Sequence, residues 1–173
     1  MEEVILVDPH DRQTGTMEKL EAHRQGLLHR AFSVVILNSK GELLLQKRAP
    51  HKYHCAGLWS NTCCSHPRPC ESTAEAARRR LKEEMGIDLE PRFVYSFIYK
   101  ANLDNHLTEH EVDHVFTGRF DGIPEANPAE VAAWRFVSLN SMYAEVIHNP
   151  ERFTPWLRLM ITHPEFNYLF DRL

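Results

Sequence analysis

The sequence lacks several features that would assign it to a specialised class of protein. Its 20 lysines and arginines are outnumbered by 24 aspartates and glutamates, which gives a formal net charge of −4. This balance disfavours a protein that binds nucleic acid, because such a protein needs a basic surface to neutralise many phosphates. Internal repeats and low-complexity segments are also missing, and 43% hydrophobic with 25% charged residues is typical of a globular protein.

Long apolar runs are absent as well. The run at residues 4–7 is far too short to cross a bilayer, and no later run reaches the required length of about 20 residues. The opening residues MEEVILVDPHD carry acids where a signal peptide carries positive charge. We therefore expect a cytoplasmic protein that does not bind membranes. A length of 173 residues predicts a single domain over residues 1–173, and we expect a monomer.

Cysteine is scarce and histidine is plentiful. The four cysteines include no CxxC pair of the kind found in zinc ribbons. Cys63 and Cys64 are adjacent and the cytosol is reducing, so free thiols are expected. The 11 histidines stand out, because histidine is the commonest metal ligand and titrates near neutral pH. The composition therefore indicates a metal centre or an acid–base site.

Apolar periodicity and turn residues predict an α/β (α+β) fold with a mixed sheet flanked by helices. Strands are expected at residues 4–7, 33–38, 43–48, 93–101, 111–120 and 134–138, with 33–38 and 43–48 forming a hairpin. Helices are expected at residues 17–28, ending near Gly26, at 72–85, and from Thr154 as N-cap through about Ile161. Residues 8–16 are rich in turn formers, and 49–71 read as a long irregular loop, a feature that is often functional. The apolar tail 162–173 is expected to pack as a terminal helix or lid.

The helix at 72–85 has the clearest signals. Ser72 and Glu75 have capping-box spacing, and Gly86 follows as the terminating residue. The same helix offers Arg79–Glu83 and Arg80–Glu84 pairs four residues apart. These pairs have two interpretations: surface ion pairing, or carboxylates that hold a divalent ion bound to a diphosphate.

Three further clusters could carry chemistry. Cys64 and His66 lie two residues apart in the long loop, where they could form a nucleophile and base, contribute to a metal shell, or be structural. Glu109, Glu111 and Asp113 alternate along a predicted strand, so they share one face. Three such carboxylates repel one another unless a cation lies among them or water solvates them. His23 and His29 do not share a helical face, but they converge if the helix breaks at Gly26.

The helix with its preceding loop resembles the Nudix box, G-x5-E-x7-R-E-U-x-E-E-x-G-U, where U is a bulky apolar residue. The matching residues are Glu71, Arg79, Leu81, Glu83, Glu84, Gly86 and Ile87. Ser65 replaces the leading glycine, and Arg80 replaces the glutamate that follows Arg79. Arg80 puts a cation where a hydrolase has a metal-binding carboxylate, so it weakens a multi-metal hydrolytic centre and could instead bind a phosphate.

Four stretches in order, TGTMEKLEAH, LHRAFSVVILNSKGELLLQKRA, GLWSNTCCSHP and EHEVDHVF, resemble type I isopentenyl-diphosphate isomerases. The resemblance runs from about Val4 to Trp156 and implies a Nudix-type sandwich. It also implies an enzyme that interconverts isopentenyl and dimethylallyl diphosphate by protonating and deprotonating the alkene, with a small prenyl diphosphate as its partner.

Residue by residue, the resemblance implies a catalytic Cys64, which stands in a C-x-H-P context, and a catalytic Glu111 assisted by Tyr99. It implies a metal centre, holding Mn²⁺ or Zn²⁺, formed by His23, His29, His66, Glu109 and Glu111. It further implies a Mg²⁺ that Glu84 holds against the diphosphate. The implied substrate contacts are Lys19, Arg48, Lys52, Arg80 and Trp156.

Two other functions compete with this interpretation. A Nudix diphosphatase acting on nucleoside diphosphate derivatives would share the fold, and fold does not determine function. Arg80 and the histidine-rich cluster disfavour it. A metal-binding domain without turnover is permitted by the cysteine and histidine counts, but the ordered set of catalytic-type residues disfavours it.

Overall fold

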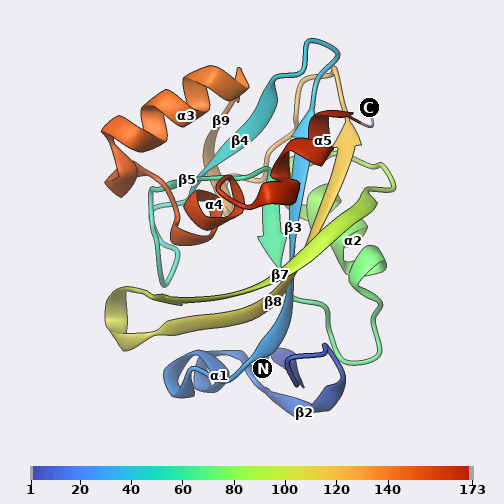
Figure 1. The fold of residues 1–173 in the computed structure, drawn as a ribbon, viewed down its shortest axis with the longest axis vertical. Helices are drawn as coiled ribbons and strands as arrows, with labels where there is room; N and C mark the ends of the chain where they lie inside the picture. Colours follow the sequence, from blue (N-terminus) through green and yellow to red (C-terminus); the bar gives the residue numbers. More distant parts are fainter. Residues whose placement is uncertain (1, 172–173) are drawn as a thin grey trace.

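The structure is a computed structural model that describes residues 2–171, and its organising element is the buried strand β3 (His29–Leu37). β3 pairs in parallel with β8 (Thr108–Arg119) and antiparallel with three other strands. Those three are β1 (Glu3–Val7), β4 (Leu43–Arg48) and β6 (Cys63–Ser65). Parallel and antiparallel pairing in one sheet confirms the predicted mixed sheet (Figure 1).

Four other strands extend the sheet, which has nine strands within residues 2–171. They are β2 (Gln13–Glu18), β5 (Trp59–Ser60), β7 (Arg92–Asn102) and β9 (Val131–Val137). The α-helices are α1 (Lys19–Gln25), α2 (Thr73–Met85), α3 (Leu139–His148), α4 (Pro155–Met160) and α5 (Tyr168–Asp171). Short 3-10 turns lie at η1 (Asp104–His106), η2 (Pro150–Arg152) and η3 (Pro164–Asn167).

Helices cover both faces of the sheet, so β3 is apolar on both sides. Val34 and Ile36 pack with Leu81 and Met85 of α2. Val35 and its alternate neighbours pack against α3, α4 and the C-terminal segment. Two buried faces explain the continuous apolar run in β3, because a central strand needs no polar face. The two cores flank the sheet as layers (Figure 1).

The α2 helix forms as the sequence predicts. The Ser72 hydroxyl accepts the Glu75 backbone N–H at 3.3 Å, and the Glu75 carboxylate accepts the Ser72 N–H at 3.0 Å. Gly86 ends the helix with φ +67°, and a Cβ there would lie 2.7 Å from the Cβ of Glu125. Only glycine fits this position without strain.

Several predicted boundaries were wrong. Residues 13–16 are not a turn but part of β2, and α1 starts at Lys19 rather than residue 17. The strands β3, β8 and β9 each begin three or four residues earlier than the apolar pattern indicates. Backbone pairing continues these strands through polar residues such as His29 and Thr108, which interrupt the apolar pattern, although Phe32 and Val131 among the added residues are buried in the core. The helix α3 was not predicted, although its N-cap Ser138 accepts the Ser141 N–H at 3.2 Å.

Thr154 is the N-cap of α4, as predicted, but its side chain makes no hydrogen bond to the helix. Its hydroxyl donates to Ser60 Oγ at 3.2 Å instead, and Pro155 opens α4 as expected. The long loop at 49–71 is irregular apart from β5 and β6. None of the helices within residues 2–171 combines the length and apolar composition that a bilayer crossing requires.

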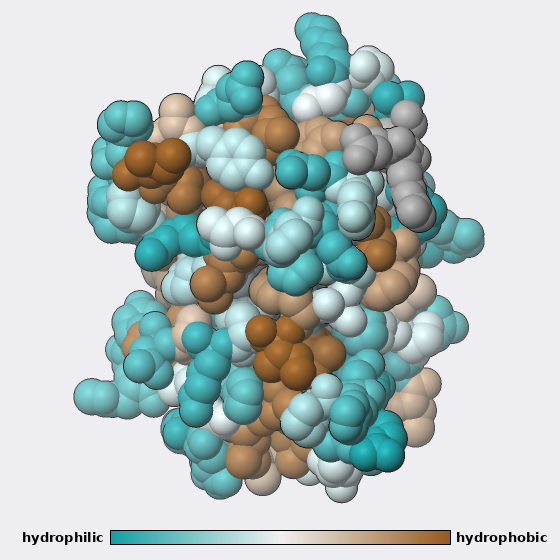
Figure 2. All heavy atoms as spheres, viewed as in Figure 1, coloured by the Kyte–Doolittle hydropathy of each residue, from teal (hydrophilic) through white to brown (hydrophobic). Residues whose placement is uncertain are grey.

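The C-terminal segment packs as a terminal helix. Phe166 and Leu169 are fully buried in the same core as Val35 and Leu157. On the face drawn in Figure 2, apolar side chains form separate small groups among hydrophilic ones. Phe166 and Leu169 of the predicted 162–173 segment therefore contribute to the core, while residues 172 and 173 of that segment lie outside the described residues.

The burial of Phe166 predicts a large effect on stability. Phe166→Ala should lower the free energy of unfolding by about 3–5 kcal/mol, because it empties a space in a packed core. Tyr168→Ala is the matched control, since Tyr168 is 50% exposed and should change stability by no more than about 0.5 kcal/mol. Urea denaturation of both variants measures the difference, and equal small effects would contradict the assignment of this segment to the core.

Candidate active site

Three acidic side chains of β8 project into the protein. Glu109, Glu111 and Asp113 alternate along the strand and are 5%, 5% and 1% exposed. They share one face, as the spacing predicts, and the alternative of a face solvated by water is wrong. Burial and the Glu111 charge raise the pKa of Glu109, and the same two causes raise the pKa of Asp113 to about 8.

Tyr99 joins two of these carboxylates. It lies directly opposite Glu111 in the β7–β8 pair. Its hydroxyl is 2.7 Å from Glu111 Oε2 and 3.0 Å from Glu109 Oε2. A phenol carries one proton, so it donates to one carboxylate at a time. Burial, followed by the charges of Glu109 and Glu111, raises the pKa of Tyr99, so it stays a donor at neutral pH.

Three imidazoles surround Glu111. His29 faces it across the parallel β3–β8 pair, and His66 follows β6. The Nε2 atoms of His29 and His66 lie 3.4 and 3.0 Å from Glu111 Oε1 and 3.2 Å from each other. His23 enters from α1, which ends at Gly26 with φ +62°. One potential ligand atom each from His23, His29, His66 and Glu111 lie within 4.8 Å of one another.

The imidazoles are oriented for a cation. His23 Nδ1 lies 2.7 Å from the Lys19 carbonyl, and His29 Nδ1 lies 2.8 Å from the Leu27 carbonyl. Donation by Nδ1–H leaves the lone pair on Nε2, which is a common arrangement of metal-binding histidines. No hydrogen-bond partner for His23 Nε2 occurs within the described part of the chain. The nitrogen and carboxylate donors therefore fit a divalent transition metal.

The electrostatics are consistent with that fit. Burial lowers the pKa of His66 to about 3, so the ring is neutral at pH 7 and can bind a metal. Burial raises the pKa of Glu111, but its close contacts with the imidazoles of His29 and His66 outweigh burial and lower the pKa well below the ordinary value. Glu111 is therefore an anion beside the neutral His66 ring.

Cys64 lines the same pocket as Glu111. It pairs with Ser33 across the β3–β6 strands, while His29, four residues earlier on β3, pairs with Glu111. Alternate residues share a face, so Cys64 and Glu111 project from the same side of the sheet. The lining of this partly open pocket also includes Tyr99 and Trp156.

Trp156 is held rigidly in the pocket wall. Its Nε1–H points at Ser60 Oγ and Asn61 Oδ1, at 2.9 and 3.1 Å. The Arg48 guanidinium lies 5.2 Å from the centre of its ring. A buried tryptophan with a satisfied N–H keeps its aromatic face available to a cation.

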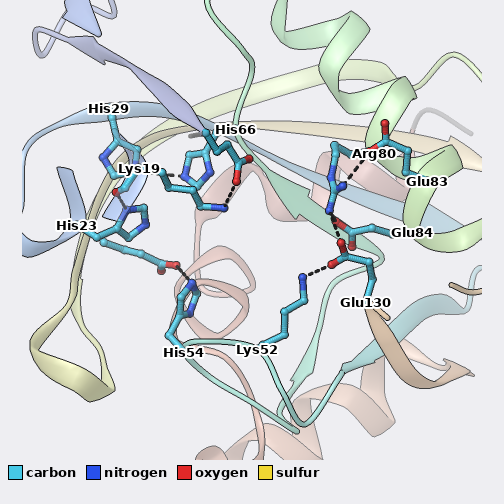
Figure 3. A network of polar contacts seen from close by, with 12 residues as sticks. Lys19, His23, His29, Lys52, His54, His66, Arg80, Glu83, Glu84 and Glu130 are labelled. Atoms are coloured by element: carbon cyan, nitrogen blue, oxygen red, sulfur yellow. Dashed lines mark hydrogen bonds and ion pairs between the residues drawn. The ribbon is translucent and has the colours of Figure 1, made fainter. Parts of the chain in front are cut away.

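Cations gather at the other end of the pocket (Figure 3). Arg80 Nη2 lies 2.6 Å from Glu84 Oε1 and 3.3 Å from Glu130 Oε1. The Glu130 carboxylate also pairs with Lys52. Lys19 pairs with Glu2 at 3.2 Å. Figure 3 shows the Arg80 group on one side and the imidazoles on the other. Glu84 therefore lies with the cations and apart from the histidine cluster.

Comparison with known proteins agrees with this arrangement. Residues 27–157 match the family model described as the NUDIX domain. Isopentenyl-diphosphate Delta-isomerase 1 of Aromatoleum aromaticum is 54% identical over 160 residues, which cover 92% of this chain and 90% of that protein. The isopentenyl-diphosphate Delta-isomerase of Burkholderia multivorans is 51% identical, with 92% and 91% covered. The chain belongs to this isomerase family. Its Nudix domain confirms the predicted fold class.

Solved structures show the same fold at lower identity. A crystal structure from Deinococcus radiodurans superposes with a TM-score of 0.76 at 20% identity, covering 91% of this chain and 96% of the other. A MutT protein from Methanosarcina mazei superposes with a TM-score of 0.65 at 23% identity, covering 84% and 94%. At these identities the likeness establishes the architecture of this isomerase-family chain alone.

The residues that the sequence assigns to the site fall into two groups. Those that line the pocket are Lys19, Arg48, Lys52, Cys64, His66, Arg80, Glu84, Tyr99, Glu109, Glu111 and Trp156. His23 and His29 are fully buried and complete the histidine cluster behind Glu111. Glu109 groups with His23 and a further histidine, His54, and not with the His29 set.

Two residues near the predicted site, His54 and Glu130, were not predicted from the sequence. Burial, followed by the charge of Arg48, lowers the pKa of His54 to about 2, so the ring is neutral. Its only signal was its place in a loop that holds three histidines. Glu130 lies far along the chain from Lys52 and Arg80, and no local pattern indicates that they meet.

The environment of Cys64 predicts that its thiol reacts slowly with alkylating agents. Burial raises its pKa to about 12, while the nearby Arg48 opposes this shift and the carboxylates of Glu84, Glu109 and Glu111 add to it. Between pH 7 and 10, its alkylation by iodoacetamide should therefore rise about tenfold per pH unit without a plateau. The exposed Cys70 should react first at pH 8, and peptide mass spectrometry measures both rates. A Cys64 rate that levels off near pH 9 would contradict this environment.

Proposed function

We propose that this single-domain protein interconverts isopentenyl diphosphate and dimethylallyl diphosphate. One observation carries the proposal: a thiol, Cys64, and a buried carboxylate, Glu111, line one pocket that has cations at its other end. A prenyl diphosphate matches the two ends of this pocket, because it has a reactive alkene at one end and a diphosphate at the other. The names of relatives at about 50% identity support the same activity.

The chemistry requires an acid and a base. Protonation of an unactivated alkene produces a tertiary carbocation, and removal of a proton from the neighbouring carbon forms the isomeric double bond. Cys64 keeps its proton at neutral pH, as a proton donor must, and Glu111 is ionised, as a base must be. The reverse reaction exchanges these roles. Tyr99 donates to Glu111 and could share its proton.

The carbocation needs protection from water. The aromatic face of Trp156 stabilises a desolvated cation by about 2 kcal/mol. Trp156 and Tyr99 are buried and present aromatic surface at this end of the pocket. A site that excludes water prevents capture of the cation as an alcohol.

The histidine cluster would hold a divalent Mn²⁺ or Zn²⁺. His23, His29, His66 and Glu111 would bind it, with Glu109 nearby, and the ion would supply positive charge that favours the ionised form of Glu111. The carboxylate of Glu111 lines the same pocket as Cys64. The imidazoles shield it from solvent and set its orientation.

The cation end would bind the diphosphate. Lys19, Lys52 and Arg80 supply charge, Arg48 extends it toward Trp156, and Glu84 would share a Mg²⁺ with the phosphate oxygens. Gln46 Nε2 donates to Glu84 at 2.9 Å and orients this carboxylate. Arg80 pairs with Glu83 and Glu84, which in a diphosphatase would be free to hold metal ions, so hydrolysis is disfavoured.

An assay in D₂O tests the function. With Mg²⁺, isopentenyl diphosphate should give the allylic isomer with deuterium incorporated, as measured by proton NMR. Cys64→Ser and Glu111→Gln should each lower kcat by about 10²–10⁴-fold, because each removes a proton-transfer group. Cys70→Ser, at an exposed position, is the control and should match wild type.

Each result has a separate meaning. Near-full turnover of Cys64→Ser or Glu111→Gln would remove that residue from the mechanism. Release of phosphate from nucleotides, without isomerisation, would favour the diphosphatase.

The position of Glu130 predicts that its carboxylate weakens substrate binding. Its carboxylate occupies Lys52 and Arg80, and the diphosphate must displace it. Glu130→Gln should therefore lower KM by about 2–5-fold, equivalent to about 1 kcal/mol or less, with kcat unchanged. Glu151→Gln, at an exposed position in η2, makes the same charge change outside the pocket lining and is the control. An unchanged or higher KM in Glu130→Gln would contradict the competition.

A further inference from the structure

The cation end of the pocket adjoins a second, more open hollow, which we call the outer hollow. The residues that line both spaces are Lys19, Lys52, Tyr53, Ser65 and Arg80. The residues that line only the outer hollow are Glu2, His51, Ala129 and Glu130. We call Lys19, Lys52 and Arg80 the boundary cations, because a diphosphate bound in the pocket would meet them from the inner side.

Carboxylates contact the boundary cations from the outer side. Glu2 Oε2 lies 3.2 Å from Lys19 Nζ. Glu130 pairs with Lys52, and its Oε1 lies 3.3 Å from Arg80 Nη2. Figure 3 shows Glu130 between Lys52 and Arg80. Each boundary cation therefore has an acidic partner that belongs to the outer hollow and not to the pocket.

Strand register brings Glu2 to this position. Glu3 pairs with Glu18 in the antiparallel β1–β2 ladder, so the residue before Glu3 meets Lys19, the residue after Glu18. The Glu2 carbonyl accepts the Lys19 backbone N–H at 2.9 Å. The Glu2 side chain is 54% exposed, whereas that of Lys19 is 17% exposed. The main chain thus holds the carboxylate on the solvent side of the cation.

Both carboxylates are ionised at neutral pH. Burial raises the pKa of Glu2, but the charge of Lys19 and its hydrogen bond outweigh burial and lower the pKa. Burial also raises the pKa of Glu130, and the hydrogen bond and charge of Lys52 outweigh it in the same way. The outer hollow therefore presents two negative charges beside the boundary cations.

These charges bear on the length of the phosphate chain that the site accepts. A cluster of cations alone attracts a ligand more strongly as its negative charge rises. The prenyl group occupies the other end of the pocket, so a third phosphate would extend past the boundary cations into the outer hollow. There it would approach Glu2 and Glu130, and like charges repel.

We infer that Glu2 and Glu130 make the site selective for a terminal diphosphate by disfavouring ligands that carry a further phosphate. The inference rests on the proposed function, which places the diphosphate among the boundary cations. Specificity is a difference between two affinities, and repulsion of the wrong ligand can supply it. Glu130 weakens the binding of the substrate itself, and the selectivity gained against triphosphates offsets that loss.

Two unreactive ligands test this selectivity by direct binding. Isopentyl diphosphate and isopentyl triphosphate lack the alkene, and their shared isopentyl group directs the third phosphate outward. In calorimetric titrations with excess Mg²⁺, the wild type should bind the triphosphate no more tightly than the diphosphate. Glu2→Gln and Glu130→Gln should each raise the affinity for the triphosphate about 2–5-fold more than that for the diphosphate.

Glu3→Gln is the matched control for Glu2→Gln. It makes the same charge change at the next residue, and Glu3 is exposed and lines neither the pocket nor the outer hollow. The ratio of the two affinities in Glu3→Gln should equal the wild-type ratio. A ratio that changes as much in Glu3→Gln would overturn the inference, because it would show a general effect of net charge.

The remaining outcomes separate this inference from the proposed function. A wild type that binds the triphosphate more tightly would overturn the selectivity, and an unchanged ratio in either variant would overturn it for that residue. Protein that binds neither ligand would refute the diphosphate site on which the inference rests. Absence of isomerisation in D₂O, with the affinity ratios as expected, would refute the function and leave the selectivity standing.

Discussion

The site depends on one electrostatic constraint: three carboxylates of β8 are buried on a single face. Removing charge from water is costly, and neighbouring carboxylates repel. The chain offsets this cost with a different partner for each group. Tyr99 contacts Glu109 and Glu111, His29 and His66 surround Glu111, and Ser33 Oγ donates to Asp113 at 2.8 Å. The imidazole cluster is thus required by the carboxylates as well as by any metal that they bind.

The helix α2 carries a cation among its acidic residues, and the sequence already shows this. In the Nudix pattern its acidic residues gather metal ions, but here Arg80 stands among them and pairs with Glu83 and Glu84. Arg79 forms two contacts with Glu71, at 2.6 and 2.8 Å, and holds the preceding loop against the helix. One cation thereby neutralises part of an acidic helix face.

The features that could be predicted from the sequence are those that depend on residues close together in the chain. The capping box of α2, the hairpin strands and the alternation of Glu109, Glu111 and Asp113 depend on residues close in sequence, so periodicity identifies them. The resemblance supplied the assembly of His23, His29 and His66, which spacing alone left open. His54 and Glu130 could not be found in either way. Their partners are distant in sequence, and a polar residue in a loop has no periodic signal. The early starts of β3 and β8 were missed for a related reason, since tertiary pairing extends strands beyond their apolar residues.

The strand β3 is hydrogen-bonded to β6 through Phe32, Ser33 and Val34 and to β8 along its whole length. The backbone positions of Cys64 and Glu111 are therefore both determined by pairing with the same strand, β3. The separation of the two backbone positions is determined by strand register. To change it while keeping both side chains on the same face would require a shift of two residues in one strand, which would move an entire ladder of hydrogen bonds. The spacing between the thiol and the carboxylate is thus built into the sheet itself.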